Sequence, residues 1–586
     1  MFKILGKLRL TEWIYVLLGV LLIVGQVWLD LEMPKYMEKI TYVLNVQSGS
    51  VNIAEIWING GYMLLCGLGS AIFAVFTGFI ASKIAAGLGK NLRAEVFRKV
   101  NNLGIEEIKQ FSVPSLITRT TNDVVNMQNF ISMGFNVLIK APILAGWTIA
   151  EITNINWQWS TATALAVFTL VLVIITLMII TVPRYRKIQK LTDNLNDVTR
   201  ENITGIRVVR AYNAEDYQHA KFQTANHNLA HNYLITGNAM SLMPAMMNLV
   251  MNSLTLSIYL IGAWLISRAS VGESAILFGQ MVKLVPYSMN VVMSFVMMTM
   301  IFIMLPRSIV SARRINEVLD TKLSICDGPG AQPTEHQGEI EFRHVSFKYP
   351  GAADYIIRNA NLKIERGQTV AFIGSTGSGK TTLVNLVPRF YDATEGEVLV
   401  DGINVKDYKQ EDLHNKIGYV PQKAMLFSGN IRDNIDFGQD GQGPKTDEQI
   451  NEAIRIAQAA DFVGKVGLDA SVAQGGTNFS GGQKQRLCIA RAIARQAEFL
   501  IFDDSFSALD YKTDRNLRKE IKKITQKTGS TVLIVAQRIG TIKDADKIVV
   551  FDNGNIVGIG THDELAKNCQ VYQEIIKSQF SKEELA

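Results

Sequence analysis

The chain is poor in cysteine and in charged residues. Its 586 residues include four cysteines, and 19% of the chain is charged. The cysteines lie too far apart for a disulfide framework or a zinc-binding spacing. They are Cys66, Cys326, Cys488 and Cys569. The formal net charge of +6 is small for this length, so no nucleic-acid partner is expected, and the cations are better explained by loops beside a membrane.

Apolar residues make up 48% of the chain and are concentrated in its first half. A helix that spans a bilayer needs roughly 20 mostly apolar residues. Six segments reach this length: Trp13–Leu31, Ile56–Ile80, Phe130–Ile152, Trp157–Val182, Met240–Ile266 and Ala275–Leu305. The first is too long for the apolar core of a signal peptide, and no small-residue cleavage site follows it. We therefore predict a transmembrane domain with six spanning helices over residues 1–320.

The positions of Lys and Arg predict how these helices are oriented. Cations crowd the connection between the second and third spans and the one between the fourth and fifth, whereas the other connections are short and carry few. Positive loops stay in the cytosol, so both long connections and both termini are expected there. The long connections have helical spacing, which indicates helices that continue into the cytosol and turn back. The turns, Glu107–Ser115 and Val208–Tyr217, are expected to contact the second half of the chain; a free-standing helical hairpin is the alternative.

Some polar and adaptable residues lie inside the predicted spans. Lys140 is the clearest, because ionisable residues within a membrane are costly and often functional. Pairing within the helix bundle or reaching toward the membrane surface explains it equally well. The last two spans are rich in methionine, such as Met246 and Met297. Methionine suits a surface that binds many shapes, with core packing or lipid contact as the alternative role.

The composition changes after residue 320. A Pro- and Gly-containing linker is predicted over residues 321–337, and a soluble α/β domain over residues 338–586. Within it, residues 374–381 match the phosphate-loop pattern G-x-x-x-x-G-K-[ST] at every fixed position, after the apolar strand Thr369–Ile373. The glycines let backbone N–H groups face phosphate oxygens, and the following helix adds positive potential at its N-terminus.

This loop predicts binding of a nucleotide with its metal ion. Lys380 is expected to reach the β- and γ-phosphates, and the Thr381 hydroxyl to bind Mg²⁺. The residues expected to contact the nucleotide here are Gly374, Ser375, Thr376, Gly377, Ser378, Gly379, Lys380, Thr381 and Thr382.

Three further segments could complete the nucleotide contacts. Tyr349 follows a short apolar stretch and can stack on adenine. Gln422 follows another predicted strand and can bind Mg²⁺ and sense the γ-phosphate. Residues 480–483 read Ser-Gly-Gly-Gln before the predicted helix Lys484–Arg495, and this Gly-rich start is a second phosphate-binding surface. The residues expected to contact nucleotide there are Ser480, Gly482 and Gln483.

The next predicted strand, Glu498–Asp504, ends in carboxylates. Asp503 is expected to hold Mg²⁺ through water, and Asp504 stands where an attacking water needs a general base. Asp510 lies in the loop after this strand and is a further predicted nucleotide contact. Another predicted strand ends at Gln537, the second candidate at the catalytic position.

These motifs together resemble those of the ATP-binding cassette (ABC) exporter family, over nearly the whole chain. Residues 119–123 and 311–315 also resemble stretches of its membrane domain. The resemblance implies a multidomain membrane protein of the bacterial plasma membrane: a six-helix α-helical transmembrane domain with long cytosolic extensions, then an α/β P-loop nucleotide-binding domain. It also implies ATP and Mg²⁺ as cofactors and a dimer of two such halves. Each of two ATP molecules would touch the phosphate loop of one cassette and the Ser-Gly-Gly-Gln segment of the other.

Two residues depart from the family pattern. The family usually has Glu at the position of Asp504 and His at that of Gln537. Asp draws the carboxylate back by roughly 1 Å, and such a displacement can cost on the order of 10²-fold in rate. Gln cannot become a cation, so it cannot stabilise γ-phosphate charge as His can. We therefore expect slow ATP cleavage at this chain's own site and an intact contribution to a partner's site, as in a heterodimer with one degenerate site. A homodimer that tolerates Asp is the alternative.

The predicted function is that of a subunit of an ATP-driven exporter for amphipathic small molecules. Export of drugs is the first hypothesis, and a lipid flippase or peptide exporter is the related alternative. An ATP-gated regulator or channel subunit that transports nothing is the alternative from a different class. The two long cytosolic helical connections favour transport.

Overall fold

The computed structural model describes residues 2–46, 52–331, 336–438 and 443–579. The chain divides into two compact units. Met1–Asn101 and Val113–Thr321 form the membrane unit, and Asn102–Ser112 and Lys322–Ala586 form the nucleotide unit. A few residues of the predicted linker and cassette, 332–335, 439–442 and 580–586, lie outside the described residues.

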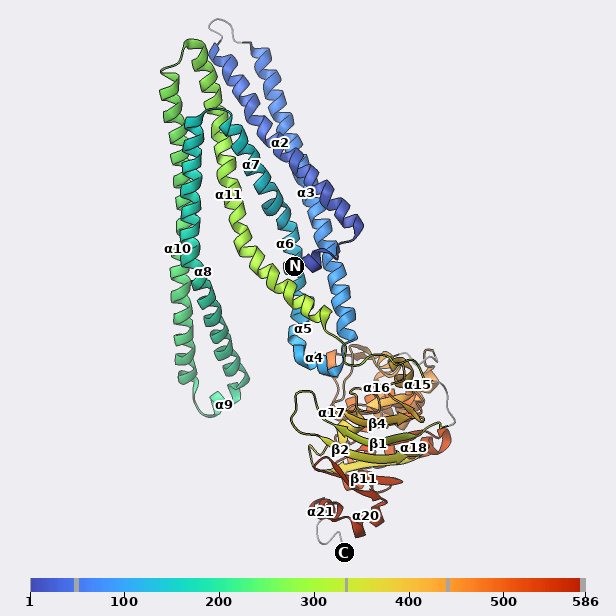
Figure 1. Cartoon of the computed structure of the whole chain (residues 1–586). Helices are drawn as coiled ribbons and strands as arrows, with labels where there is room; N and C mark the ends of the chain where they lie inside the picture. The colour runs from blue at the N-terminus through green and yellow to red at the C-terminus, as the bar shows by residue number, and fades with distance from the viewer. Residues whose placement is uncertain (1, 47–51, 332–335, 439–442, 580–586) are drawn as a thin grey trace. The chain divides into compact units, whose positions relative to one another are not determined.

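The membrane unit is built from long helices (Figure 1). They are α1 (Phe2–Leu5), α2 (Leu10–Val46), α3 (Ile53–Asn101), α5 (Val113–Thr120), α6 (Asn122–Gly134), the π-helix η1 (Phe135–Lys140), α7 (Ala141–Thr153), α8 (Trp157–Thr204), α9 (Ile206–Ala211), α10 (Glu215–Ile266) and α11 (Val271–Asp320). Among the described residues, six helical segments are long and apolar enough to cross a membrane, and each contains one of the predicted spans. The six spans and their long helical extensions are therefore confirmed.

The spans pack as neighbouring pairs within this unit. Helix α2 lies along α3, α8 lies along α10, and α11 packs against α2 and α7. Figure 1 shows α8 and α10 side by side and joined at their ends by α9. Asn156 caps α8 by accepting a hydrogen bond from the backbone N–H of Gln158, and Ser270 and Glu273 form a capping box on α11. These caps fix where two of the longest helices begin.

Lys140 finds its partner inside the bundle. Its Nζ lies 3.5 Å from Oδ2 of Asp30 on α2, and Oδ1 of Asp30 accepts a hydrogen bond of 2.5 Å from the Ser70 hydroxyl on α3. Lys140 ends the π-helix η1, a widened turn that α-helices seldom contain. Pairing within the bundle is thus the arrangement that the structure adopts.

The nucleotide unit is an α/β domain with two main sheets. The central sheet has the order β12-β11-β3-β10-β9-β6, in which all pairs are parallel except β12 with β11. Its strands are β3 (Thr369–Gly374), β6 (Ile417–Val420), β9 (Phe499–Asp503), β10 (Thr531–Val535), β11 (Lys547–Asp552) and β12 (Asn555–Gly560). The antiparallel sheet has the order β2-β1-β4-β5 and comprises β1 (Ile340–Phe347), β2 (Ile357–Ile364), β4 (Glu395–Val400) and β5 (Ile403–Asn404).

Helices and a short two-stranded sheet complete the unit. The short strands are β7 (Gly429–Asn430) and β8 (Ser471–Val472). The helices are α4 (Ile105–Phe111), α12 (Lys380–Val384), α13 (Gln410–Asn415), α14 (Ile431–Ile435), α15 (Asp447–Ile456), α16 (Ala460–Val466), the 3₁₀-helix η2 (Gln474–Gly476), α17 (Gly481–Ala494), α18 (Tyr511–Thr528), α19 (Ile539–Ile542), α20 (His562–Asn568) and α21 (Gln570–Gln579).

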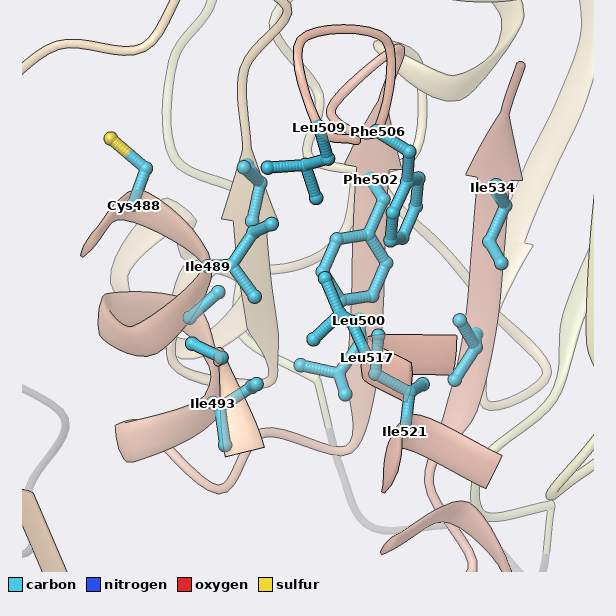
Figure 2. Close-up of a cluster of buried hydrophobic side chains, with 14 of the residues drawn as sticks. Cys488, Ile489, Ile493, Leu500, Phe502, Phe506, Leu509, Leu517, Ile521 and Ile534 are labelled. Carbon is cyan, nitrogen blue, oxygen red and sulfur yellow. The ribbon is translucent and has the colours of Figure 1, made fainter. Parts of the chain in front are cut away.

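Strand β9 is buried on both faces, as expected of a central parallel strand. Figure 2 shows Leu500 and Phe502 in an apolar cluster with Ile489 of α17 and Ile521 of α18. Phe499 and the other alternate residues of β9 belong to a second cluster, shared with the antiparallel sheet. Packing on both sides fixes the carboxyl end of β9, where the predicted catalytic carboxylates lie.

Helix α4, within the first predicted cytosolic turn, belongs to the nucleotide unit. Glu107 is only 4% exposed, and its Oε1 accepts a hydrogen bond of 2.8 Å from the backbone N–H of Ser324. Lys109 Nζ donates to the hydroxyl of Tyr391 at 3.2 Å. Burial raises the pKa of Glu107, but the hydrogen bonds from Ser324 outweigh it, and the net pKa lies below the usual Glu value. A charged Glu107 therefore holds α4 to the segment that follows α11.

Candidate nucleotide-binding site

The phosphate loop joins β3 to α12 at the carboxyl edge of the central sheet. Gly377 and Gly379 have φ values of +84° and +103°, which side chains rarely adopt. A Cβ on Gly379 would lie 2.8 Å from the carbonyl oxygen of Ile356. The loop therefore requires glycine at 379 for both conformation and space, which is the open backbone that phosphate binding needs.

Lys380 lies within this loop. Its Nζ donates to the carbonyl oxygens of Gly374 at 2.9 Å and Ser375 at 2.7 Å, and it also lies 3.3 Å from the Ser378 hydroxyl. Burial lowers the pKa of Lys380, although Asp504 and Asp503 oppose this. The ammonium is already placed to exchange carbonyl oxygens for phosphate oxygens, so the residues present fit a nucleotide phosphate.

Thr381 and Asp503 bring two oxygen ligands together. The Thr381 hydroxyl donates to Oδ1 of Asp503 at 2.7 Å, across the step from α12 to the end of β9. Burial raises the pKa of Asp503, and the hydrogen bond from Thr381 partly offsets the rise. Hydroxyl and carboxylate oxygens are the ligands that Mg²⁺ prefers beside phosphates. These two residues would hold Mg²⁺ when nucleotide is bound.

Tyr349 is fixed beside the phosphate-binding helix. Its ring packs edge-on against Phe347 and Tyr391, with centroid separations of 5.0 and 5.3 Å, and its hydroxyl lies 3.0 Å from that of Thr382. Lys109 Nζ lies 5.4 Å from the centroid of the Tyr349 ring. The structure thus brings an aromatic ring next to α12, as adenine stacking requires.

Two predicted residues from different loops, Gln422 and Gln537, approach the side chain of Asp504. Its Oδ2 accepts a hydrogen bond from Nε2 of Gln537 at 2.9 Å, and Nε2 of Gln422 lies 3.4 Å from the same oxygen. Burial raises the pKa of Asp504, and the hydrogen bond from Gln422 is the largest opposing effect. Asp504 has a φ of +46°, a strained backbone conformation that Asp tolerates better than most residues. We call this arrangement of Gln422, Asp504 and Gln537 the amide clamp.

The Ser-Gly-Gly-Gln segment forms the capped start of α17. The Ser480 hydroxyl accepts from the backbone N–H of Gln483 at 3.3 Å, and the Gln483 side chain accepts from Ser480 N–H at 2.9 Å. This capping box starts the helix at Gly481, whereas the sequence predicted Lys484. A Cβ on Gly482 would lie 3.1 Å from the carbonyl oxygen of Ala508, so this helix start packs against the loop after β9.

Asp510 caps α18 by accepting from the backbone N–H of Thr513 at 3.0 Å, and this hydrogen bond lowers its pKa. Among the described residues, the side chains of Ser480, Gln483 and Asp510 make no hydrogen bond to the phosphate loop. The predicted nucleotide contacts therefore form two groups. One surrounds Lys380, and the other lies at the starts of α17 and α18.

Sequence reasoning missed two residues of the site. Gln485, which is buried, points its Nε2 at the carbonyl oxygen of Asp504 at 3.5 Å. The only sequence feature that could have indicated Gln485 is its position two residues after Gln483 on the same helix. Tyr391 packs on Tyr349 but lies far from it in the chain, and nothing in its local sequence indicates the contact.

A phosphate loop on a parallel sheet, paired with a six-span helical unit, defines a membrane protein with an ATP-binding cassette. Comparisons with known proteins agree: residues 16–285 match the ABC transporter transmembrane region, and residues 357–507 match the ABC transporter domain. An ABC transporter ATP-binding protein of Mycobacterium bovis is 37% identical over 523 residues, which cover 89% of this chain and 87% of that protein. The chain therefore belongs to the ABC transporter family.

Other relatives are named for a lipid substrate. The ATP-dependent lipid A-core flippase of Hahella chejuensis is 31% identical over 89% of this chain and 87% of its own, and that of Pseudomonas fluorescens is 30% identical over 85% and 81%. A solved bacterial Atm1-family ABC exporter with ATP bound superposes with a TM-score of 0.77 at 22% identity, covering 96% of this chain and 97% of that chain. The chain is thus a multi-pass ABC transporter of the plasma membrane with an ATP-binding domain, and its fold matches that of an ABC exporter.

Proposed function

We propose that this chain is one half of a heterodimeric ABC exporter and that its own ATP site binds nucleotide but hydrolyses it slowly. The amide clamp carries this proposal. Both groups that approach Oδ2 of Asp504 are neutral amides, so neither can add positive charge near a γ-phosphate. The carboxylate itself is one methylene shorter than Glu, and a shift of roughly 1 Å from productive geometry can cost on the order of 10²-fold in rate.

The roles of the other residues follow from their positions. The loop from Gly374 to Thr381, with Lys380, would hold the phosphates, and Tyr349 would stack on adenine. Thr381 and Asp503 would hold Mg²⁺, with Gln422 as a further ligand once it leaves the amide clamp. The second group of contacts would complete the partner's site, and its members are Ser480, Gly482, Gln483 and Asp510.

An amphipathic substrate, a drug or a lipid, is the cargo that we propose. The flippase names of two relatives at 30–31% identity favour the lipid class. The methionines of α10 and α11 would give the membrane unit an adaptable surface. A regulator that moves no substrate is less consistent with these relatives.

Purifying the chain alone and with its partner tests the site proposal. The expected result is slow ATP turnover by the chain alone despite normal ATP binding, and rapid turnover by the pair. Binding is measured with a fluorescent ATP analogue, so that loss of folding is not mistaken for slow chemistry. Rapid hydrolysis by the chain alone, abolished by Lys380→Ala, would contradict the heterodimer.

Transport is tested separately in inside-out vesicles that contain the pair. ATP-dependent accumulation of a fluorescent lipid or an amphipathic dye is expected, and the Lys380→Ala pair serves as the control. Undiminished ATPase activity without accumulation across a broad substrate panel would favour the regulator instead.

A further inference from the structure

The nucleotide unit contains a second concave site, distinct from the phosphate loop. A cavity of about 500 Å³ lies between α18 and the region of α19. Its floor includes Ile521 and Ile534, two residues of the apolar cluster in Figure 2. Five cations line it: Arg515, Arg518, Lys519, Lys522 and Lys543. We call it the basic pocket.

The carboxylates near the basic pocket neutralise only one of these cations. Arg518 Nε lies 3.1 Å from Oδ1 of Asp514, and its Nη1 lies 3.5 Å from Oδ2 of Asp544, the single acidic residue in the lining. Glu520, also on α18, forms ion pairs with Arg455 at 3.0 Å and with Lys523 at 2.6 Å. Among the residues that the structure describes, the other four cations of the pocket have no ion pair: Arg515, Lys519, Lys522 and Lys543.

The spacing of these cations concentrates their charge. Arg515, Lys519 and Lys522 are four and then three residues apart on α18, so they lie on one face of the helix. Like charges at this spacing repel each other, and a concave site with an apolar floor focuses their positive potential. Cations scattered over a convex surface would be solvated singly, whereas these converge on one cavity. An anion bound in the cavity would relieve the repulsion.

We propose that the basic pocket binds a small molecule with two or more phosphate groups. The volume is within the range of roughly 300–1,000 Å³ typical of small-ligand sites. Four unpaired cations match several negative charges better than one, and the Arg515 guanidinium can hold two phosphate oxygens at once. The Tyr511 hydroxyl, which also lines the pocket, can donate a further hydrogen bond, whereas the Thr541 hydroxyl already donates to Oδ2 of Asp514 at 3.4 Å.

The basic pocket shares part of its lining with a second cavity, which two residues of the amide clamp also line. Tyr511 and Thr541 also line a neighbouring cavity of about 540 Å³, together with Asp504 and Gln537. Helix α19 begins directly after the Gln537 loop, at Ile539. A ligand in the basic pocket would therefore touch the two helices that follow the loops of Asp504 and Gln537. The proposal itself concerns binding and is independent of whether the exporter is a heterodimer.

Calorimetric titration of the purified full-length chain with pyrophosphate tests the proposal. The chain carries Lys380→Ala, so that the phosphate loop does not contribute, and no Mg²⁺ is added. We expect saturable binding, tighter for pyrophosphate than for inorganic phosphate at equal ionic strength. Changing Arg515, Lys519 and Lys522 together to Gln is expected to weaken binding at least about tenfold, because each charge-assisted hydrogen bond contributes strongly to affinity.

A matched control distinguishes the pocket from the general positive charge of the protein. Lys409, Lys567 and Lys577 are exposed lysines outside the pocket, and changing all three to Gln removes the same charge. Binding should be unchanged in that control, and thermal melting should confirm that both triple variants are folded. The proposal is overturned if pyrophosphate does not bind saturably, if both triple variants lose affinity equally, or if the pocket variant loses none.

Discussion

At the residue scale, Asp504 is held by side chains that in an active site would face the nucleotide. Gln537 contacts the same carboxylate oxygen that Gln422 approaches, and a hydrogen bond to a charged group contributes about 1.5–3 kcal/mol when its partners are well aligned. A longer side chain at 504 would move its carboxylate into the space of the Gln537 amide. The two departures from the family pattern are therefore physically linked and should be changed together.

The combined replacement Asp504→Glu and Gln537→His is expected to activate this site. In a pair whose partner lacks its own catalytic glutamate, the double variant should raise ATPase activity by on the order of 10²-fold, and each single change should do much less. Steady-state phosphate release measures this. Adding Lys380→Ala must abolish the gained activity. A double variant no faster than the native chain would show that the two residues do not limit hydrolysis.

The raised pKa of Asp503 predicts a pH dependence of metal binding. Burial favours the neutral carboxyl, so protons compete with Mg²⁺ at a pH above the usual Asp range near 3.9. As the pH falls from 7.5 toward 5, the extra ATP affinity that Mg²⁺ provides should decline. ATP also takes up protons, so Asp503→Asn supplies the baseline, because it removes the carboxylate and keeps its shape. Identical pH profiles for the native chain and Asp503→Asn would contradict this assignment.

At the element scale, local sequence was sufficient to predict where helices and strands form, but not which elements pack against each other. The six spans were predictable because twenty apolar residues in a row have few other stable structures. The strand and helix around Lys380 followed from one motif. The pairing of Lys140 with Asp30 joins residues far apart in the chain, and only the packing of α2 beside η1 establishes it. Helix α17 begins at Gly481 and not at the predicted Lys484, because Ser480 and Gln483 form a capping box.

The pair of Asp30 and Lys140 should behave as a single unit that joins α2 to η1. Asp30→Asn leaves Lys140 without its partner and should cost about 1–3 kcal/mol, below the 3–5 kcal/mol of fully buried pairs because the Asp30 side chain is 28% exposed. Adding Lys140→Met should restore much of the lost stability. Thermal unfolding in detergent measures this, with Glu55→Gln on α3 as a matched control. Additive losses in the double variant would contradict the pairing.

At the scale of the whole molecule, the two ATP sites of unequal activity that we propose would give the transporter two different functions for its nucleotides. ATP at the amide clamp would remain bound and help to keep the cassettes together, while ATP at the other site is cleaved in each cycle. Such an arrangement would concentrate ATP hydrolysis in the partner's site, which we propose that this chain completes through Ser480 and Gln483 at the start of α17. Substitutions around Lys380 and substitutions at the starts of α17 and α18 should therefore lower ATP hydrolysis by unequal amounts.

Variants of the heterodimer in inside-out vesicles test whether the two ATP sites differ in activity. Replacing the partner's catalytic glutamate should abolish both ATP hydrolysis and transport. Asp504→Asn in this chain should lower either by no more than a few-fold, because in the proposed heterodimer its carboxylate contributes little to catalysis. Ser480→Arg should act like loss of the partner's glutamate, since it obstructs the phosphate surface at the start of α17. Fluorescent-lipid accumulation and phosphate release are measured on the same vesicles. If Asp504→Asn is as damaging as loss of the partner's glutamate, the two sites are equivalent and the heterodimer with one slow site is wrong.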